Sequence, residues 1–426
     1  MTSWRDSVIW WHVFPLGFTG AERRLADAAE QPVHRLDQVR GWLDYATSLG
    51  TNGLLLGPVF RSASHGYDTL DYFQIDPRLG DVDDLTRLIG DCVSHGTRIV
   101  LDGVFNHVSR EHQIVTRALA DGPDSAAGQW IRWVDGYPRA FEGHDRLIEL
   151  NLQHPEVVDY LVGVATHWLD LGIDGWRLDA AYAAGADAWR PFVDRVRSLR
   201  PDTWFVGEVI HGDYTDFVTR SGVDTVTQYE LWKGIWSSIR DVNLFELAHA
   251  LGRHQKMVQT FAPYTFLGNH DTTRIASQIS DERHLPHAYA LLALLPGVPA
   301  VYSGDEQGFT GEKTESEYGD DAVRPAFPAH PDQLLPFGAA TFELHQRLIG
   351  LRRRHPWLTR ATVGVRDLQN ASAVVELRSP TGPDRLDLAL NLADSELPLP
   401  SGEVLTGSDT SAGTVPPHGW TVVRPR

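Results

Sequence analysis

The chain is poor in cysteine, in basic residues and in long apolar runs. Cys92 is its only cysteine, so no disulfide can form within the chain, which fits a reducing compartment. No stretch approaches the roughly 18 uninterrupted apolar residues that a transmembrane helix requires. The 56 acidic residues outnumber the 38 basic ones, and a net charge of −18 repels both a phosphate backbone and an anionic membrane surface. We therefore expect no nucleic-acid partner and no membrane partner.

The first residues lack the features of an export signal. The apolar run over residues 8–14 is too short and too aromatic for a secretory signal peptide, and the single Arg before it is offset by an Asp. Together with the lone cysteine, this predicts a cytoplasmic protein. A chain of 426 residues exceeds what one small core supports, so we expect a large barrel or two to three units.

Short apolar runs alternate with longer segments of helical apolar spacing through the first 300 residues. This alternation is typical of parallel βαβ units, and eight such runs predict a (β/α)8 TIM barrel. The predicted strands cover residues 8–14, 52–56, 98–103, 175–178, 204–207, 224–228, 264–267 and 300–302. The predicted helices cover residues 36–49, 82–95, 155–171, 186–199, 244–259, 287–295 and 339–354.

Two regions break the alternation. Residues 108–148 are rich in Gly, Pro, Asp and Trp, and we interpret them as a short excursion between strands three and four. Residues 356–426 contain alternating runs separated by turn residues, which predicts an antiparallel, β-sandwich-like C-terminal domain. The catalytic barrel would then comprise residues 1–107 and 149–355.

Polar residues stand just beyond four of the predicted strands. In a (β/α)8 barrel the catalytic groups lie at the C-terminal ends of the strands, so these positions are the candidates for a site. Each of these four strand ends supplies a carboxylate. The residues are Asp102, Asn106 and His107 at strand three, Arg177 and Asp179 at strand four, Glu208 at strand five, and Asn269, His270 and Asp271 at strand seven.

Paired carboxylates are the usual apparatus for cleaving a glycosidic bond. One must be protonated to give a proton to the leaving oxygen, while the other, ionised, attacks or stabilises the anomeric carbon. Asp179 and Glu208 form the candidate pair. A single carboxylate at a strand end is more often a helix cap or an ion-pair partner. Four polar strand ends in sequence order favour the catalytic interpretation.

In this order, the four segments resemble the motifs of the α-amylase family of retaining glycoside hydrolases, over residues 9–306. The chain is most similar to the cyclomaltodextrinase, neopullulanase and maltooligosaccharide hydrolase branch, without the N-terminal β module of those proteins. The resemblance implies cleavage of α-glucosidic bonds in short linear or cyclic maltooligosaccharides, with an α-glucan as the small-molecule partner. Nothing in the pattern addresses the oligomeric state.

The resemblance also implies roles for individual residues. Asp179 would be the nucleophile, Glu208 the general acid and base, and Asp271 would bind sugar hydroxyls. Arg177 would hold Asp179 ionised by lowering its pKa, whereas Glu208 would need desolvation or a nearby negative charge to stay protonated. The implied substrate-binding residues are Tyr67 as a stacking platform, Asp68 paired with an arginine of the site, Asp102, His107, Arg177, Asn269 and His270.

Many members of the family hold a structural Ca²⁺ beside the excursion, with an Asn at the position of Asn106. A Lys-His pair after the nucleophile accompanies that site, and here residues 180–183 read AAYA. Calcium requires six to eight oxygen ligands, and the excursion offers few besides Asp121, Asp124 and Asp135. We therefore expect no metal site, and no other cofactor is implied.

Four functions remain in competition on the sequence. Hydrolysis is favoured, and a transglycosidase or isomerase shares the same catalytic residues but resolves the intermediate with a sugar. An inactive carbohydrate-binding relative would have lost Asp179, Glu208 or Asp271, and all three are present. A metal-dependent barrel hydrolase would need close pairs of histidine ligands, whereas His107 and His270 each follow an Asn.

Overall fold

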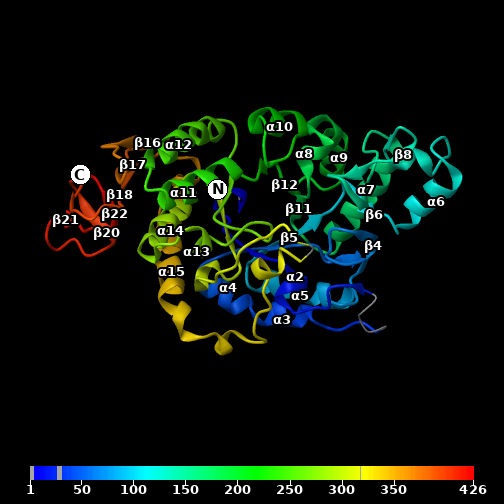
Figure 1. Ribbon diagram of the computed structural model, residues 1–426, viewed down its shortest axis with the longest axis horizontal. Coiled ribbons are helices and arrows are strands. Elements are labelled where there is room, and N and C mark those ends of the chain that lie inside the picture. Colours follow the sequence, from blue (N-terminus) through cyan, green and yellow to red (C-terminus); the bar gives the residue numbers. More distant parts are fainter. Residues whose placement is uncertain (1–3, 26–30, 317) are drawn as a thin grey trace.

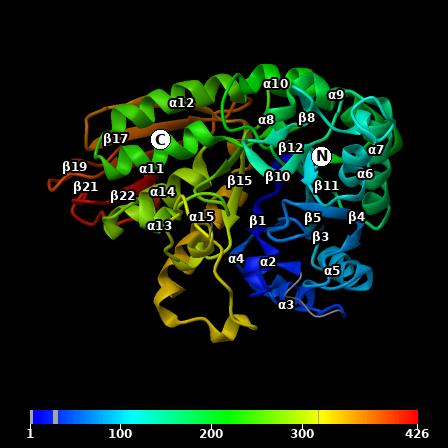
Figure 2. The same ribbon diagram turned by 45° about the vertical axis from the view of Figure 1, so that its right-hand side comes forward.

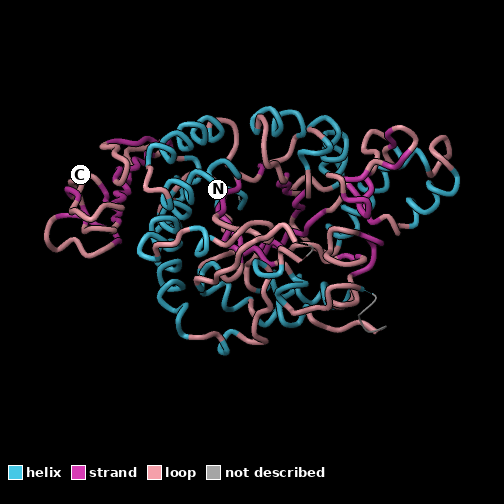
Figure 3. The backbone as a smooth tube through the Cα atoms, in the orientation of Figure 1, coloured by secondary structure: helices cyan, strands magenta, loops and turns pink. Residues whose placement is uncertain are grey.

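The computed structural model describes residues 4–25, 31–316 and 318–426. Its centre is an eight-stranded parallel sheet whose strands follow one another in chain order. Figure 3 shows strands gathered at the centre of the molecule. A bridge between Thr227 and Tyr264 joins the sixth strand to the seventh and closes the barrel. The barrel strands are β1 (Trp10–Val13), β2 (Gly53–Leu56), β5 (Arg98–Gly103), β11 (Gly175–Leu178), β12 (Trp204–Gly207), β13 (Thr225–Val226), β14 (Tyr264–Phe266) and β15 (Val298–Tyr302). The predicted (β/α)8 fold class is confirmed.

Helices surround the sheet on its outer face (Figures 1 and 3). The short ones are α1 (Trp4–Ser7), α2 (Pro15–Phe18), α8 (Ala181–Ala184) and α13 (Ile275–Gln278). The longer ones are α3 (Leu36–Gly41), α4 (Leu43–Leu49), α5 (Val82–Ser94), α7 (Pro155–Asp170), α9 (Ala186–Leu199), α10 (Tyr214–Ser221), α11 (Tyr229–Arg240), α12 (Leu244–Val258), α14 (Leu285–Leu294) and α15 (Ala339–Arg354).

The structure differs from the predicted helices in two places. Residues 36–49 form two helices because the chain tightens at Trp42, whose N–H bonds to the carbonyl of Val39 while its indole is buried. The sequence pattern also misses α10 and α11. In α11 the buried face includes Ser237 and Ser238, whose hydroxyls bond to backbone carbonyls one turn earlier, so the apolar period is interrupted.

Large aromatic side chains fill the N-terminal end of the barrel. Trp10 and Trp204 begin β1 and β12, and their rings stack at a centroid distance of 5.0 Å. Gly53 makes room for them, because a Cβ at this position would lie 2.4 Å from the ring of Trp10. Because these rings fill the N-terminal end of the barrel, polar chemistry is confined to the C-terminal ends of the strands.

Two insertions rise from the C-terminal end of the barrel. A hairpin of β3 (Phe60–Ser62) and β4 (Thr69–Ile75) follows β2. The excursion after β5 contains β6 (His107–Ser109), α6 (Gln113–Asp121), β7 (Trp133–Val134), β8 (Tyr137–Pro138), β9 (Ala140–Phe141) and β10 (His144–Glu149). Strands β6, β10 and β9 form an antiparallel sheet at one end of the molecule (Figure 1).

The C-terminal region lies at the opposite end of the molecule from the excursion (Figures 1 and 2). It contains a five-stranded antiparallel sheet in the order β16-β17-β18-β22-β20 and a two-stranded sheet of β19 and β21. Their bounds are β16 (Thr362–Arg366), β17 (Ser372–Arg378), β18 (Arg385–Asn391), β19 (Leu397–Pro398), β20 (Glu403–Gly407), β21 (Thr414–Val415) and β22 (Trp420–Arg424). Val374, Ala389 and Val415 form a small core between the two sheets.

Among the described residues, no helix has both the length and the apolar character needed to cross a membrane.

Candidate active site

The four polar motifs meet at one end of the barrel because their strands are in register. Leu178 of β11 pairs with Gly103 of β5 on one side and with Gly207 of β12 on the other. The next residues continue this pattern, since the N–H of Asp179 bonds to Gly103 O at 3.1 Å and the N–H of Glu208 bonds to Leu178 O at 2.9 Å. Asp179 and Glu208 therefore leave neighbouring strands at the same level.

Arg177 lies among three carboxylates. Its Nη1 donates to both oxygens of Asp102, at 2.8 and 2.7 Å, and to Oδ1 of Asp179 at 3.2 Å. Its Nη2 contacts Oε1 of Glu208 at 2.7 Å. All four side chains are at least nine-tenths buried. One guanidinium thus orients the whole catalytic cluster through charge-assisted hydrogen bonds.

The electrostatics of this cluster overturn one expectation. Burial raises the pKa of Asp179 well above its ordinary value, and the charge of Glu208 adds to the rise, although Arg177 opposes it. Burial also raises the pKa of Asp102. Arg177 does lower the pKa of Asp179 as predicted, but the net shift is upward, so the expectation that Arg177 holds Asp179 ionised is not met. One guanidinium shared by three carboxylates does not offset their desolvation and mutual repulsion, so the cluster favours keeping a proton.

Glu208 has two further donors that the sequence did not single out. The hydroxyl of Tyr229 donates to Oε1 at 3.2 Å, and the backbone N–H of Ala180 donates to Oε2 at 3.0 Å. Ala180 holds a left-handed conformation with φ of 46°, which is costly for a residue with a Cβ. Tyr229 in turn accepts a hydrogen bond from Nδ2 of Asn269 at 2.8 Å. Asn269 therefore reaches Glu208 through Tyr229.

Asp271 lies in the opposite electrostatic environment. Its Oδ2 is 2.9 Å from Nε2 of His270, and its Oδ1 accepts a hydrogen bond from Nη2 of Arg324 at 2.7 Å. Burial opposes its ionisation, but the charges of His270, Arg324 and Arg177 hold its pKa well below the ordinary value. The side chain is 32% exposed, so an ionised acceptor faces outward at this position.

Tyr67, the predicted stacking platform, lies beside the carboxylate cluster. Its ring is parallel to that of His270, with centroids 5.3 Å apart, and His270 stacks in turn on Phe14 at 5.5 Å. The Tyr67 hydroxyl contacts Nε2 of His270 and donates to Oδ2 of Asp102 at 3.0 Å. Tyr67 is partly exposed. The ring therefore offers a fixed face beside the carboxylate cluster.

Asp68 does not make the contact that the resemblance implies. It accepts hydrogen bonds from the N–H of Ser64 at 3.0 Å and from the Ser64 hydroxyl at 2.5 Å. In the described parts of the chain no arginine contacts it, and Arg324 pairs with Asp271 and Asp320 instead. Asp68 thus closes the turn between β3 and β4 that carries Tyr67.

His107 links the excursion to the cluster. Its Nε2 is 3.1 Å from the carbonyl oxygen of Tyr67 and 3.9 Å from Oδ2 of Asp179, and its ring stacks on Phe141 of β9 at 4.4 Å. Burial lowers the pKa of His107 to about 3, so the imidazole is neutral. Nδ1 of His107 lies 3.3 Å from Nδ2 of Asn106. Because an amide nitrogen can only donate, Nδ1 must accept this hydrogen bond, and the proton of the neutral imidazole is on Nε2.

The ligands of a calcium ion do not gather around Asn106. Asn106 is buried and contacts His107, whereas Asp121, Asp124 and Asp135 are exposed. Within the described residues, two groups of three histidine and carboxylate side chains are close enough to hold a metal ion, and neither includes a residue of this site. The residues present therefore do not fit the calcium site of the resemblance.

The sequence patterns did not select two side chains of the site, Tyr229 and Arg324, and the reasons differ. Tyr229 directly follows the sixth predicted strand, so the strand-end rule that selected the other residues would have found it. Arg324 lies 53 residues beyond its partner Asp271, within an irregular polar segment. No local pattern marks it.

Comparisons with known proteins identify a family and relatives for this chain. Residues 22–329 match the family described as "Alpha amylase, catalytic domain". A cyclomaltodextrinase of Geobacillus thermopakistaniensis is 29% identical over 98% of this chain and 76% of its own length. An intracellular maltogenic amylase of Bacillus subtilis is 29% identical over 72% of this chain, which spans 57% of that relative. Among solved structures, the cyclic α-maltosyl-(1→6)-maltose hydrolase of Arthrobacter globiformis has a TM-score of 0.81 at 25% identity, over 99% of both chains.

Proposed function

Because the chain belongs to the α-amylase family of glycoside hydrolases, we propose that it cleaves α-1,4-glucosidic bonds in short maltooligosaccharides, linear or cyclic, with retention of configuration. The observation that carries the proposal is the joint orientation of Asp179 and Glu208 by Arg177 at adjacent strand ends. The names of the relatives support the substrate class, since they include a cyclomaltodextrinase and a hydrolase of a cyclic maltosyl-maltose.

The mechanism proceeds in two displacements. An oxygen of Asp179 attacks the anomeric carbon while the bond to the leaving oxygen breaks and Glu208 gives that oxygen a proton, which yields a β-glucosyl ester. Glu208 then takes a proton from water as the water oxygen attacks the same carbon and Asp179 leaves. Two inversions return the α configuration. The first step requires the proton on Glu208 and an ionised Asp179.

The surrounding residues orient the sugar. Asp271, which is ionised and partly exposed, accepts hydrogen bonds from sugar hydroxyls, and Tyr67 supplies the stacking face. His107 and His270 line the position of the sugar under attack. Asp102 acts by positioning Arg177, and Asn269 acts by positioning Tyr229. Asp68 shapes the turn that carries Tyr67. We further propose a cytoplasmic location, supported by the lone buried Cys92 and by the intracellular relative.

Product analysis tests the reaction class. We expect purified protein to convert maltotriose, maltoheptaose and β-cyclodextrin only to shorter linear sugars in a chromatographic time course. Longer or re-linked sugars at early times would instead identify a transglycosidase, in which a sugar replaces water in the second step. Absence of any product from every α-glucan would support an inactive binding relative.

The configuration of the first product tests the double displacement. Proton NMR at early times should show the new reducing end mainly as the α anomer, because two inversions restore the starting configuration. Mainly β product would exclude a covalent intermediate on Asp179. A sample left to mutarotate provides the equilibrium reference.

Tyr229 is a positioning residue, because it acts through Glu208. Tyr229→Phe removes the hydroxyl that donates to Glu208 and accepts from Asn269, and we expect about a tenfold loss of kcat with KM changed less than about threefold. Tyr289→Phe is the matched control, because the Tyr289 hydroxyl is buried on α14 without a hydrogen-bond partner among the described residues. Equal losses in both variants, or a loss confined to KM, would contradict the role.

A further inference from the structure

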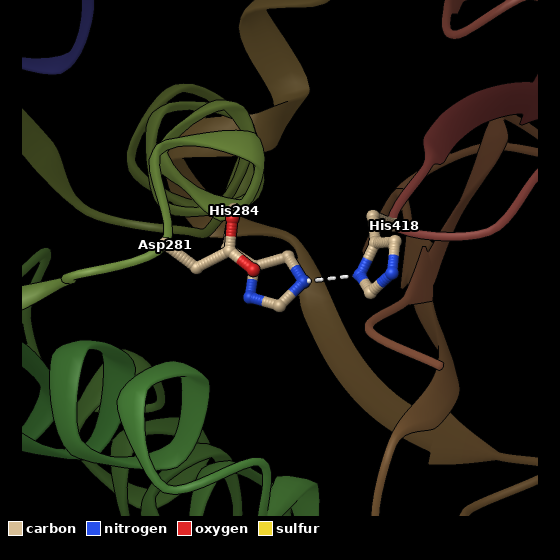
Figure 4. A group of neighbouring side chains, drawn as sticks. All are labelled: Asp281, His284 and His418. Atoms are coloured by element: carbon tan, nitrogen blue, oxygen red, sulfur yellow. Dashed lines mark hydrogen bonds between the residues drawn. The ribbon is translucent and has the colours of Figure 1, made fainter. Parts of the chain in front are cut away.

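Three metal-ligating side chains meet where the barrel contacts the C-terminal domain (Figure 4). Asp281 and His284 come from the 3₁₀ turn η3 (Glu282–His284) and its cap, just before α14. His418 comes from the turn between β21 and β22 and lies 134 residues further along the chain. This cluster of Asp281, His284 and His418 takes no part in the proposed reaction.

The ligand atoms of the three residues face one another. Nε2 of His284 is 2.9 Å from Nδ1 of His418, and one ligand atom of each residue lies within 4.8 Å of the others. Zinc–nitrogen bonds of about 2.0–2.1 Å in tetrahedral geometry separate two ligand nitrogens by about 3.3 Å. Binding one ion therefore requires the two nitrogens to separate by about 0.4 Å and the two rings to turn until both lone pairs point at the ion.

The backbone holds His418 in this place at a cost. Its φ of 55° lies in the left-handed region, which residues with a Cβ rarely adopt. The turn is fixed by the bond from the His418 N–H to Ala393 O and by His287 Nε2, which lies 2.9 Å from Gly419 O. His287 belongs to α14, so the barrel itself supports the turn that presents His418.

A carboxylate lies on the outer side of His418. Oδ1 of Asp394 is 2.8 Å from Nε2 of His418, the ring nitrogen that points away from His284. Histidines that bind metals commonly donate their second N–H to a carboxylate, which fixes the tautomer and makes the ligand nitrogen more basic. Asp394 therefore stands where the outer partner of a metal-bound His418 is expected.

Arg283 is the cation that competes for Asp281. Its Nη2 lies 2.6 Å from Oδ2 of Asp281, but the Arg283 side chain is 60% exposed, and an ion pair this exposed is weak in water.

We propose that Asp281, His284 and His418 bind one Zn²⁺ ion, with water as the fourth ligand, and that this ion ties the C-terminal sheet to the barrel. Two imidazoles and a carboxylate suit zinc, whereas calcium and magnesium prefer oxygen ligands alone. The second group of such side chains, His34, Asp81 and Asp84, is a weaker candidate. His34 is exposed there, and Asp84 already serves in the capping box of α5.

Titration of untagged, chelator-treated full-length protein with ZnCl₂ tests the site. We expect one Zn²⁺ per chain by calorimetry, and a rise in Tm when Zn²⁺ is added, because the ion binds only the folded chain. His418→Asn should weaken binding at least about thirtyfold, and Asn tolerates the left-handed backbone. Asp394→Asn should weaken it about tenfold through loss of the outer partner.

His34→Asn is the matched control and should leave both the stoichiometry and the Tm rise unchanged. If His418→Asn folds poorly, Asp281→Asn gives the same test at a partly exposed position. Wild-type protein that binds no Zn²⁺ would overturn the proposal. Affinity unchanged in both His418→Asn and Asp281→Asn, or lost in His34→Asn, would overturn it as well. None of these measurements depends on the catalytic activity.

Discussion

Replacing Asp179 by Asn is expected to abolish turnover while leaving the fold intact. The amide keeps the volume of the side chain but cannot form the glucosyl ester, and loss of a nucleophile typically costs about 10³-fold or more in kcat. The amide oxygen can still accept the hydrogen bond of Arg177, and Arg177 keeps its contacts with Asp102 and Glu208. The loss should therefore be chemical and not structural.

The raised pKa of Asp179 adds a second expectation for the same variant. A carboxyl whose pKa is higher in the folded than in the unfolded chain binds protons more tightly when folded, so its ionisation at rising pH destabilises the fold. Asn carries no charge to desolvate beside Glu208 and Asp102. Asp179→Asn should thus have a Tm at pH 7 equal to or above that of the wild type, with the gain largest at high pH.

Kinetics on maltoheptaose and thermal unfolding between pH 5 and 8 check both points. Asp202→Asn is the matched control, because Asp202 is exposed at the opposite end of β12 from Glu208 and should change neither quantity. Activity of Asp179→Asn within about tenfold of the wild type would refute the nucleophile assignment. A clear fall in its Tm would refute the electrostatic account.

Replacing Glu208 by Gln is expected to separate substrates by their leaving groups. Gln cannot donate the proton that a sugar leaving group needs, so kcat/KM on maltooligosaccharides should fall about 10²- to 10⁴-fold. A substrate such as α-maltosyl fluoride needs no proton at the first step, so its kcat/KM should fall much less. Because kcat/KM reports the first step and not the hydrolysis of the ester, the ratio of the two kcat/KM values reports general acid catalysis itself.

This ratio also distinguishes the loss of the acid from a change in the fold. An amide NH₂ at the place of Oε2 would face the N–H of Ala180, so the turn after the nucleophile can shift in Glu208→Gln. Such a shift would slow both substrates alike, as would the loss of a purely structural residue. Equal losses on maltoheptaose and on the fluoride would contradict the role of Glu208 as the acid.

Much of the architecture could be read from local patterns. The eight apolar runs gave the barrel strands, and the rule that barrel chemistry lies at the C-terminal strand ends selected Asp102, Arg177 and Glu208, which the structure brings into contact. The helices with a regular apolar face, such as α5 and α7, were predicted near their observed bounds. α11 was missed because buried serines interrupt its apolar period.

Other features depend on segments that are distant in the sequence. Arg324 reaches Asp271 across 53 residues and His418 reaches His284 across 134, and no periodicity links such positions. Asp68 was expected beside an arginine, but the turn it closes gives it Ser64 as a partner. These contacts follow from how the loops pack on the finished barrel.

The sequence by itself determined the strands, the order of the polar motifs and the end of the barrel at which they gather, because strand period and parallel connection are local properties of the chain. Only the tertiary structure determined in which direction the pKa of each of these groups is shifted. The pKa of Asp179 rises and that of Asp271 falls because burial and the number of nearby charges differ between two carboxylates at the same barrel end. Those quantities depend on distances between side chains that only the folded molecule sets.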